Sequence, residues 1–132
     1  MTIKINESLA NARLDQVTVA RDAGVGPGSI RVYNGVRPAT GGAATTLLAE
    51  PVFSDPSSPA ASGGVLTANA ITSANALVTG TATWFREVDG NGNFVLDGDV
   101  GLSGSDLNLN TVDLVSGVPV SISSYVLNGG NL

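Results

Sequence analysis

The sequence predicts a mainly β protein, an antiparallel β-sandwich or small β-barrel of about seven to eight short strands with one N-terminal α-helix. From residue 29 onward, short apolar segments with alternating polar residues recur, separated by turn dipeptides such as Asn34-Gly35. The first 24 residues instead carry apolar side chains at helical spacing. Because a sandwich and a barrel use the same alternation, the sequence leaves both topologies open.

The N-terminal segment has the start and stop signals of a helix. Asn6 can cap it, Glu7 suits the positive end of the helix dipole, and Gly24 is a natural C-terminal stop. A thin apolar stripe is expected from Ala10, Leu14 and Val17. The charged residues expected to face away from that stripe are Arg13, Asp15, Arg21 and Asp22.

The remaining chain divides into predicted strands and loops. Strands are expected over residues 29–33, 45–53, 65–71, 76–88 and 94–100, followed by alternating segments around Leu107 and Val120. Residues 54–64 form a loop by composition, and residues 89–93 close a hairpin. The predicted organisation is therefore a helical arm with a Gly/Pro linker over residues 1–28 and a β domain over residues 29–132.

Composition excludes several classes of function. The 132 residues include no Cys and no His, which removes disulfides, zinc sites built on Cys or His, and catalysis that depends on either residue. The net charge of −5 and six scattered basic residues do not suit nucleic acid. No apolar run is long enough to span a bilayer, and no signal peptide is recognised at the start. We therefore expect no enzyme activity, no cofactor, no nucleic-acid partner and no membrane partner.

The acidic segment around Asp89 allows two interpretations. Oxygen donors at Asp89, Asn91, Asn93, Asp97 and Asp99 could hold a hard cation such as calcium. The EF-hand pattern fails, however, because Phe94 stands where that loop needs Gly and Val100 where it needs Glu. Asn-Gly and Asp-Gly are also what a hairpin needs. We therefore favour a turn, assign no metal ligand, and leave open whether residues 89–99 bind a cation.

Charge is distributed unevenly along the chain. Residues 1–50 hold five of the six basic side chains, whereas residues 51–132 hold Arg86 alone among seven acids. One interpretation is a solvated acidic surface. The other is a basic end that docks on an acidic partner, or between copies of the chain. The candidate interface residues are then Lys4, Arg13, Arg21, Leu14 and Val17.

Four segments resemble small structural proteins of tailed bacteriophages and prophages. These segments are IRVYNGVRPATGGAATTLLAE at residues 30–50, ASGGVLTANAI at 61–71, TGTATWFR at 79–86 and GSDLNLNT at 104–111. The resemblance covers most of the chain from the helix to Ser124. It implies a non-enzymatic component of the virion, made in the host bacterial cytoplasm, and brings no catalytic residues.

Within a virion, the resemblance implies two placements. The first is a capsid decoration (cement) protein that binds the major capsid protein on the outer head surface and stabilises the lattice, as a homo-oligomer with a trimer favoured. The alternative is a tail or head–tail connector accessory, or a tail-associated module that binds a receptor or glycan.

Overall fold

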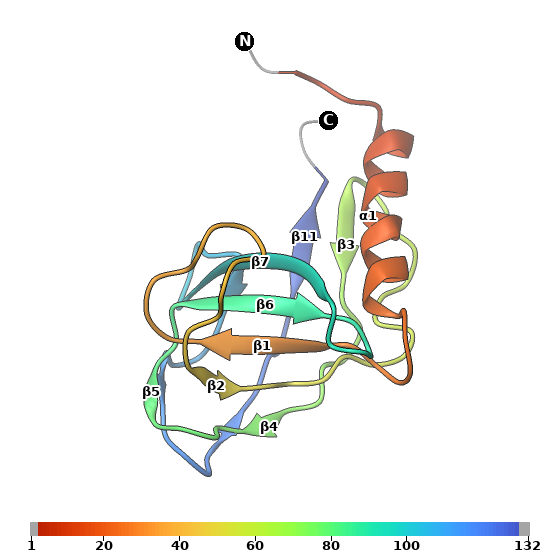
Figure 1. Ribbon diagram of the computed structural model, residues 1–132. Helices are drawn as coiled ribbons and strands as arrows, with labels where there is room; N and C mark the ends of the chain where they lie inside the picture. Colours follow the sequence, from red (N-terminus) through yellow and green to blue (C-terminus); the bar gives the residue numbers. More distant parts are fainter. Residues whose placement is uncertain (1–2, 130–132) are drawn as a thin grey trace.

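The computed structural model describes residues 3–129 and confirms a mainly β fold with one helix, whose curled sheets form a half-barrel (Figure 1). Helix α1 spans Glu7–Arg21. Eleven strands follow within the described residues, several of them only two residues long. They are β1 (Ser29–Tyr33), β2 (Leu47–Ala49), β3 (Val65–Thr67), β4 (Ala74–Asn75), β5 (Gly80–Thr81), β6 (Trp84–Val88), β7 (Phe94–Gly101), β8 (Leu107–Asn108), β9 (Asp113–Leu114), β10 (Pro119–Val120) and β11 (Val126–Asn128).

The main sheet has five strands in the order β2-β1-β6-β7-β8. The neighbours β2, β1, β6 and β7 pair antiparallel, with Arg31 opposite Arg86 and Arg86 opposite Asp97. Strand β8 pairs parallel to β7, which departs from the expected all-antiparallel pattern. The chain reaches β8 through a loop at residues 102–106, after which Leu107 and Asn108 pair with Val100 and Gly101 at the end of β7.

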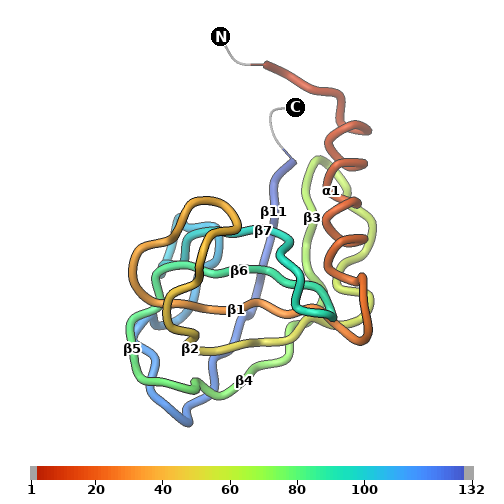
Figure 2. Tube along the Cα trace, viewed as in Figure 1, coloured from red at the N-terminus to blue at the C-terminus, as the bar shows by residue number. Residues whose placement is uncertain are grey.

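Three two-stranded pairs continue the curl of this sheet: β3 with β11, β4 with β10 and β5 with β9. A backbone hydrogen bond joins the segment after β4 to the main sheet, because Leu77 N donates to Leu48 O in β2, and the β5–β9 pair is extended by a bond from Ala82 N to Val112 O. The tube drawn in Figure 2 shows the late segment of the chain passing behind the main sheet. The curled sheets therefore enclose one core.

The core lies inside this curl and is dominated by aliphatic side chains with Phe53, Phe85 and Tyr125. Phe85 stands edge-on to Tyr125, with ring centroids 5.6 Å apart and an interplanar angle of 89°. Burial of such rings contributes much of the hydrophobic stabilisation of a small domain. The single Trp, Trp84, is fully buried on the other face of the main sheet and stacks on Tyr33 at 4.4 Å.

Several predicted strands are shorter in the structure than in the sequence pattern. The predicted strand 76–88 is divided because the chain changes partners: Ala82 N donates to Val112 O, but Thr83 N donates to Tyr33 O. In the predicted strand 45–53, Pro51 interrupts regular pairing because it has no N–H to donate. The alternation of apolar and polar residues in these segments predicts which side chains are buried. It does not show that the backbone changes its hydrogen-bond partner within a segment.

Helix α1 begins as predicted and ends earlier than expected. The Asn6 side chain accepts a hydrogen bond from Ser8 N at 2.7 Å, and Asp22 rather than Gly24 is the C-cap. Asp22 is held there because both its carboxylate oxygens accept from Ser57 N at 3.2 Å. Within residues 3–129, no helix has the length and apolar character needed to cross a membrane.

Candidate functional site

Three of the five candidate interface residues meet at one place on the surface. Arg13, Leu14 and Val17 line a shallow hollow of about 310 Å³ between α1 and the end of β11. Asn128 and Gly129 form its other wall. A Cβ at Gly129 would lie 3.0 Å from Leu14 Cδ1 and 3.1 Å from Ala10 Cβ, so glycine allows this close approach of the chain to the helix. We call this feature the helix hollow.

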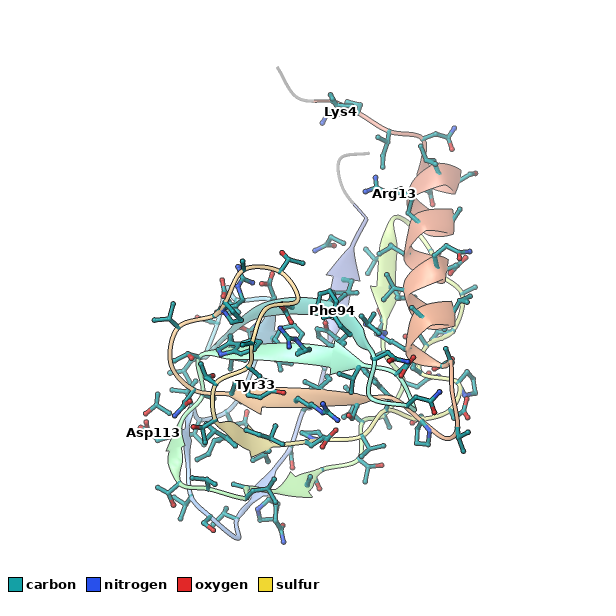
Figure 3. The ribbon with its side chains drawn as sticks, in the orientation of Figure 1. Lys4, Arg13, Tyr33, Phe94 and Asp113 are labelled. Atoms are coloured by element: carbon teal, nitrogen blue, oxygen red, sulfur yellow. The ribbon has the colours of Figure 1, made fainter. Side chains whose placement is uncertain are left out.

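The helix hollow lies at the basic end of the molecule. Lys4 and Arg13 are both exposed, and Figure 3 shows them at the end of the molecule where α1 begins. Among residues 3–129, the ion pairs involve four other arginines, and neither Lys4 nor Arg13 takes part in one. Both positive charges are therefore available to a partner that approaches this end.

Arg21 is not on the surface, and the expectation that it faces away from the apolar stripe is wrong. Its side chain is 1% exposed, and its guanidinium pairs with the buried carboxylate of Glu87 on β6. The fixed hydrogen-bonding fork of arginine matches a carboxylate and makes such burial possible. Arg21 therefore anchors the helix internally and does not form part of an exposed interface in this fold.

A polar stripe on α1 attaches the helix to the loop before β3. Glu7, Asn11 and Asp15 accept hydrogen bonds from the backbone N–H groups of Gly63, Gly64 and Ala61 at 3.0, 2.8 and 2.8 Å. The spacing of four residues places these side chains on one helix face. Because α1 buries few apolar side chains, these hydrogen bonds are needed to hold the helix in place. They therefore determine the shape of the helix hollow.

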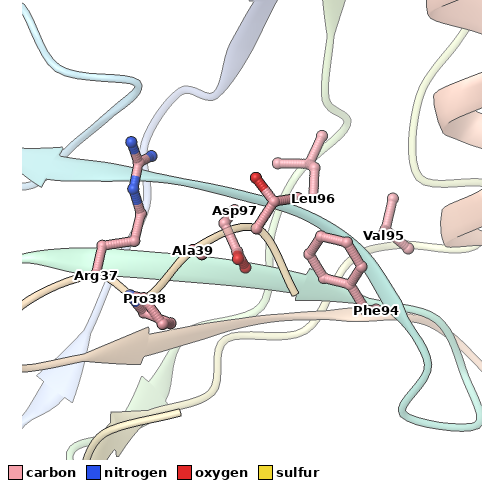
Figure 4. Close-up of a pocket in the computed structure, with 8 residues that line it drawn as sticks. Arg37, Pro38, Ala39, Phe94, Val95, Leu96 and Asp97 are labelled. Atoms are coloured by element: carbon pink, nitrogen blue, oxygen red, sulfur yellow. The ribbon is translucent and has the colours of Figure 1, made fainter. Parts of the chain in front are cut away.

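A second surface feature is a groove of about 460 Å³ between β7 and the loop that covers the main sheet (Figure 4). Its lining includes Arg37, Thr40, Phe94 and Asp97. Phe94 is 42% exposed, an unusual position for an aromatic ring in a chain with so few of them. We call this feature the β7 groove.

Arg86 supports the β7 groove from beneath. Its guanidinium carbon lies 5.3 Å from the Trp84 ring centroid and 5.2 Å from that of Phe94. Its Nε and Nη2 donate to Asp97 at 2.7 and 3.1 Å, and Nη2 also donates to Gly42 O at 2.8 Å. Burial opposes ionisation of Asp97, but the hydrogen bonds and charge of Arg86 outweigh it and hold the pKa of this carboxyl below its usual range. The ion pair between Arg86 and Asp97 therefore holds the wall of the groove in place.

The carboxylates of the segment 89–99 already have protein partners. The Asp89 carboxylate accepts from Asn93 N, Asn91 N and Asn93 Nδ2, and these bonds, that to Asn93 first, lower its pKa. Asp97 pairs with Arg86, and Asp99 Oδ1 lies 3.5 Å from Arg37 Nη1. Over residues 3–129 the structure contains no group of three or more acidic side chains placed to hold a metal ion. The arrangement around Asp89 is that of a hydrogen-bonded turn.

The sequence points to three residues that line the helix hollow, but it assigns no interface role to the residues that line the β7 groove. Arg37 and Phe94 lie 57 positions apart, and only the fold of the 34–46 loop over β7 brings them together. Comparison of the chain with protein-family models, curated protein sequences and solved structures gives no match. The resemblance to phage structural proteins therefore remains a prediction.

Proposed function

We propose that this chain is a non-enzymatic structural protein of a bacteriophage particle, a capsid decoration protein that binds the outer surface of the head. The observation that carries the proposal is the helix hollow, where Leu14 and Val17 lie beside the charge of Arg13, which takes part in no ion pair among residues 3–129. Such a combination suits an acidic segment of a partner protein that also buries an apolar side chain.

The proposed binding is weak at each site and strong in total. One hollow offers little apolar area, and an exposed ion pair contributes at most about 1 kcal/mol. A particle surface repeats the partner many times, so linked copies bind with an avidity that no single contact supplies. Retention on the particle should therefore weaken at high salt, because the contribution of Lys4 and Arg13 is screened.

Copy number in purified particles tests this proposal. Quantitative mass spectrometry against the major capsid protein should give a comparable number of copies for a decoration protein. A count that matches one small ring or a few fibres would place the chain at the connector or tail. Absence from the particle would overturn the structural role.

Charge reversal tests the docking surface. Arg13→Glu should reduce the fraction of chain retained on particles, measured by co-sedimentation of added protein with particles that lack it. Arg37→Glu is the matched control, because it makes the same change at an exposed arginine in the β7 groove. Equal loss in both variants would show that overall charge, and not the helix hollow, determines retention.

The β7 groove supports a second candidate function, a module that binds host glycans. A half-exposed aromatic ring beside Arg37 and Thr40 offers one face for sugar C–H groups and donors for sugar oxygens. Binding of purified chain to immobilised bacterial surface polysaccharide, lost on Phe94→Ala and kept on Lys4→Glu, would favour this function. No binding to any polysaccharide of the host surface would remove it.

A further inference from the structure

Two long stretches of the chain carry no charged side chain. Residues 56–85 and residues 114–132 contain no Asp, Glu, Lys or Arg, although 17 such residues (six basic and eleven acidic) occur elsewhere. A solvated surface normally carries about a quarter to a third charged residues, with both signs interspersed. Long uncharged stretches in a small, acidic protein therefore need an explanation.

The fold brings these two stretches together. Strands β3 and β4 come from the first stretch and pair with β11 and β10 from the second. Between β4 and β10, Ala76 N donates to Val118 O at 2.9 Å and Gly117 N donates to Ala76 O at 2.8 Å. Figure 1 shows β4 and β5 at the end of the molecule away from the start of α1. We define the surface formed by residues 74–81 and 113–121 as the base face.

The base face exposes four large apolar side chains on two adjacent segments. Leu77 and Val78 are 61% and 43% exposed, and Val115 and Val118 are 53% and 52% exposed. Ser116 N donates to Thr79 Oγ1 at 3.0 Å, so the two segments form one hydrogen-bonded unit. Clustered apolar side chains of this kind on a soluble protein mark an interaction site more often than scattered ones do.

A hollow accompanies these side chains. It has a volume of about 230 Å³, and Leu114, Val115, Val118 and Val120 supply most of its wall. Asp113, at its rim, is the one charged residue of the base face. An exposed side chain of the size of Leu77 fits such a hollow, so the face presents both a protruding apolar group and an apolar recess.

We propose that the base face is the surface through which copies of this chain associate with one another. The argument is avoidance of like-charge repulsion: with a net charge of −5, two copies repel, and contact near a symmetry axis places each charge close to its own equivalent. The base face avoids this cost because it has one charge and several exposed apolar groups. Interfaces between identical subunits are also more apolar, and poorer in charge, than interfaces with other proteins.

The position of the base face suits this role. The basic end with Lys4 and Arg13 lies at the opposite end of the molecule (Figure 3). Association through the base face therefore leaves the helix hollow exposed, and the proposal does not depend on the function proposed above.

Sedimentation velocity of the purified full chain tests the proposal. The wild-type chain should sediment as an oligomer, and Leu77→Asp with Val118→Asp should shift it to a monomer with an unchanged far-UV circular dichroism spectrum. The matched control is Leu9→Asp with Val19→Asp, which places the same charges on helix residues that are 52% and 61% exposed. That variant should remain an oligomer.

Single cysteines provide an independent readout, because the natural chain has none. Under mild oxidation, Val115→Cys should form a disulfide-linked dimer, whereas Val25→Cys, at a residue 85% exposed and away from the base face, should form far less. A monomeric wild-type chain would overturn the proposal and leave the base face to a different protein. An oligomer that survives the base-face substitutions and shows no preference for the Val115 cross-link would overturn it as well.

Discussion

Arg21 and Glu87 form an ion pair that is buried on both sides, with side chains 1% and 0% exposed. Arg21 Nε donates to Glu87 Oε1 at 2.5 Å and Nη2 donates to Oε2 at 2.9 Å. The Tyr125 hydroxyl donates to the same Oε2, and Ser58 Oγ accepts from Arg21 Nη1 at 3.1 Å. This cluster joins the last turn of α1 to the middle of the main sheet and to the segment before β11.

Removal of Arg21 should therefore destabilise the protein strongly. Arg21→Met leaves the Glu87 carboxylate buried without its cation, which costs about 3–5 kcal/mol in comparable cases. Urea unfolding followed by the fluorescence of Trp84 measures the change. The double variant Arg21→Met with Glu87→Leu should recover much of the loss, because the uncompensated charge is gone.

The partly buried pair of Arg31 and Glu50 is the natural control. It joins Nε to Oε2 at 2.9 Å, but its side chains are 33% and 34% exposed. Arg31→Met should cost less than about 1 kcal/mol. Equal effects of the two methionine variants would contradict the central role assigned to the Arg21–Glu87 pair.

Tyr125 should make the protein less stable in alkaline solution. Burial, followed by the charge of Glu87, raises the pKa of its hydroxyl far above the ordinary value. The unfolded chain releases this proton near pH 10, but the folded chain retains it. Tyr125 thus contributes stability that is complete below about pH 10 and falls by about 1.4 kcal/mol per pH unit above it.

Tyr125→Phe tests this directly. The variant loses one buried hydrogen bond at neutral pH, but the free energy of unfolding should fall less steeply between pH 10 and 11 than in the wild type. All other titratable groups are common to both proteins. Parallel stability curves for the two proteins would show that the Tyr125 hydroxyl ionises in the folded state.

The sequence predicts the elements of this fold better than it predicts their partners. Asn6 and the alternation over 29–33 and 94–100 locate α1, β1 and most of β7, because caps and burial are local signals. The parallel pairing of β8 and the division of the segment 76–88 depend on distant chain segments. Periodicity reports which side chains are buried, but it does not report which strand accepts each hydrogen bond.

The same limit applies to the candidate site. Leu14 and Val17 belong to the predicted apolar stripe, so their meeting in the helix hollow could be expected, but Arg13, predicted to face away from that stripe, lines the hollow beside them. The burial of Arg21 could not, because its partner Glu87 lies 66 residues away. Among six basic residues, nothing in the local pattern distinguishes the one that is buried.

Gly98 should be intolerant of even a methyl group. A Cβ at this position in β7 would lie 2.5 Å from Phe85 Cε1 and 2.6 Å from Phe85 Cζ. Since the Phe85 ring is fully buried, it cannot move away without strain, and Gly98→Ala should cost about 1–3 kcal/mol. Thermal unfolding of the variant measures this loss.

Two further variants separate the steric overlap between a Cβ at position 98 and the Phe85 ring from the general cost of replacing a glycine in a strand. Gly80→Ala brings a Cβ to 3.0 Å from Leu48 Cδ2, the end of a flexible side chain, and should cost less than Gly98→Ala. Phe85→Leu combined with Gly98→Ala should be less destabilising than the sum of the two single changes, because the smaller side chain relieves the contact. Additive effects would exclude the overlap as the cause.

Asp97 should contribute stability at neutral pH that disappears in acid. Its folded pKa lies below the ordinary value of about 3.9, because the bonds and charge of Arg86 outweigh the cost of burial. A depressed folded pKa gives stability that is present above the unfolded pKa and lost as the pH falls through the folded pKa. Asp97 also accepts from Gly41 N at 3.1 Å, so its protonation should loosen the loop that covers Trp84.

Asp97→Asn should therefore be less stable than the wild type by about 2 kcal/mol at pH 7, the size expected for buried hydrogen bonds to a charged group. The difference should shrink as the pH falls below about 4, where the wild type loses the same contribution. Urea midpoints at pH 7, 4 and 2.5, read from the fluorescence of Trp84, measure both effects. Asp113→Asn changes an exposed carboxylate and should alter stability at pH 7 by less than about 0.5 kcal/mol. A difference between wild type and Asp97→Asn that stays constant down to pH 2.5 would show that the carboxylate does not depend on Arg86 for its charge.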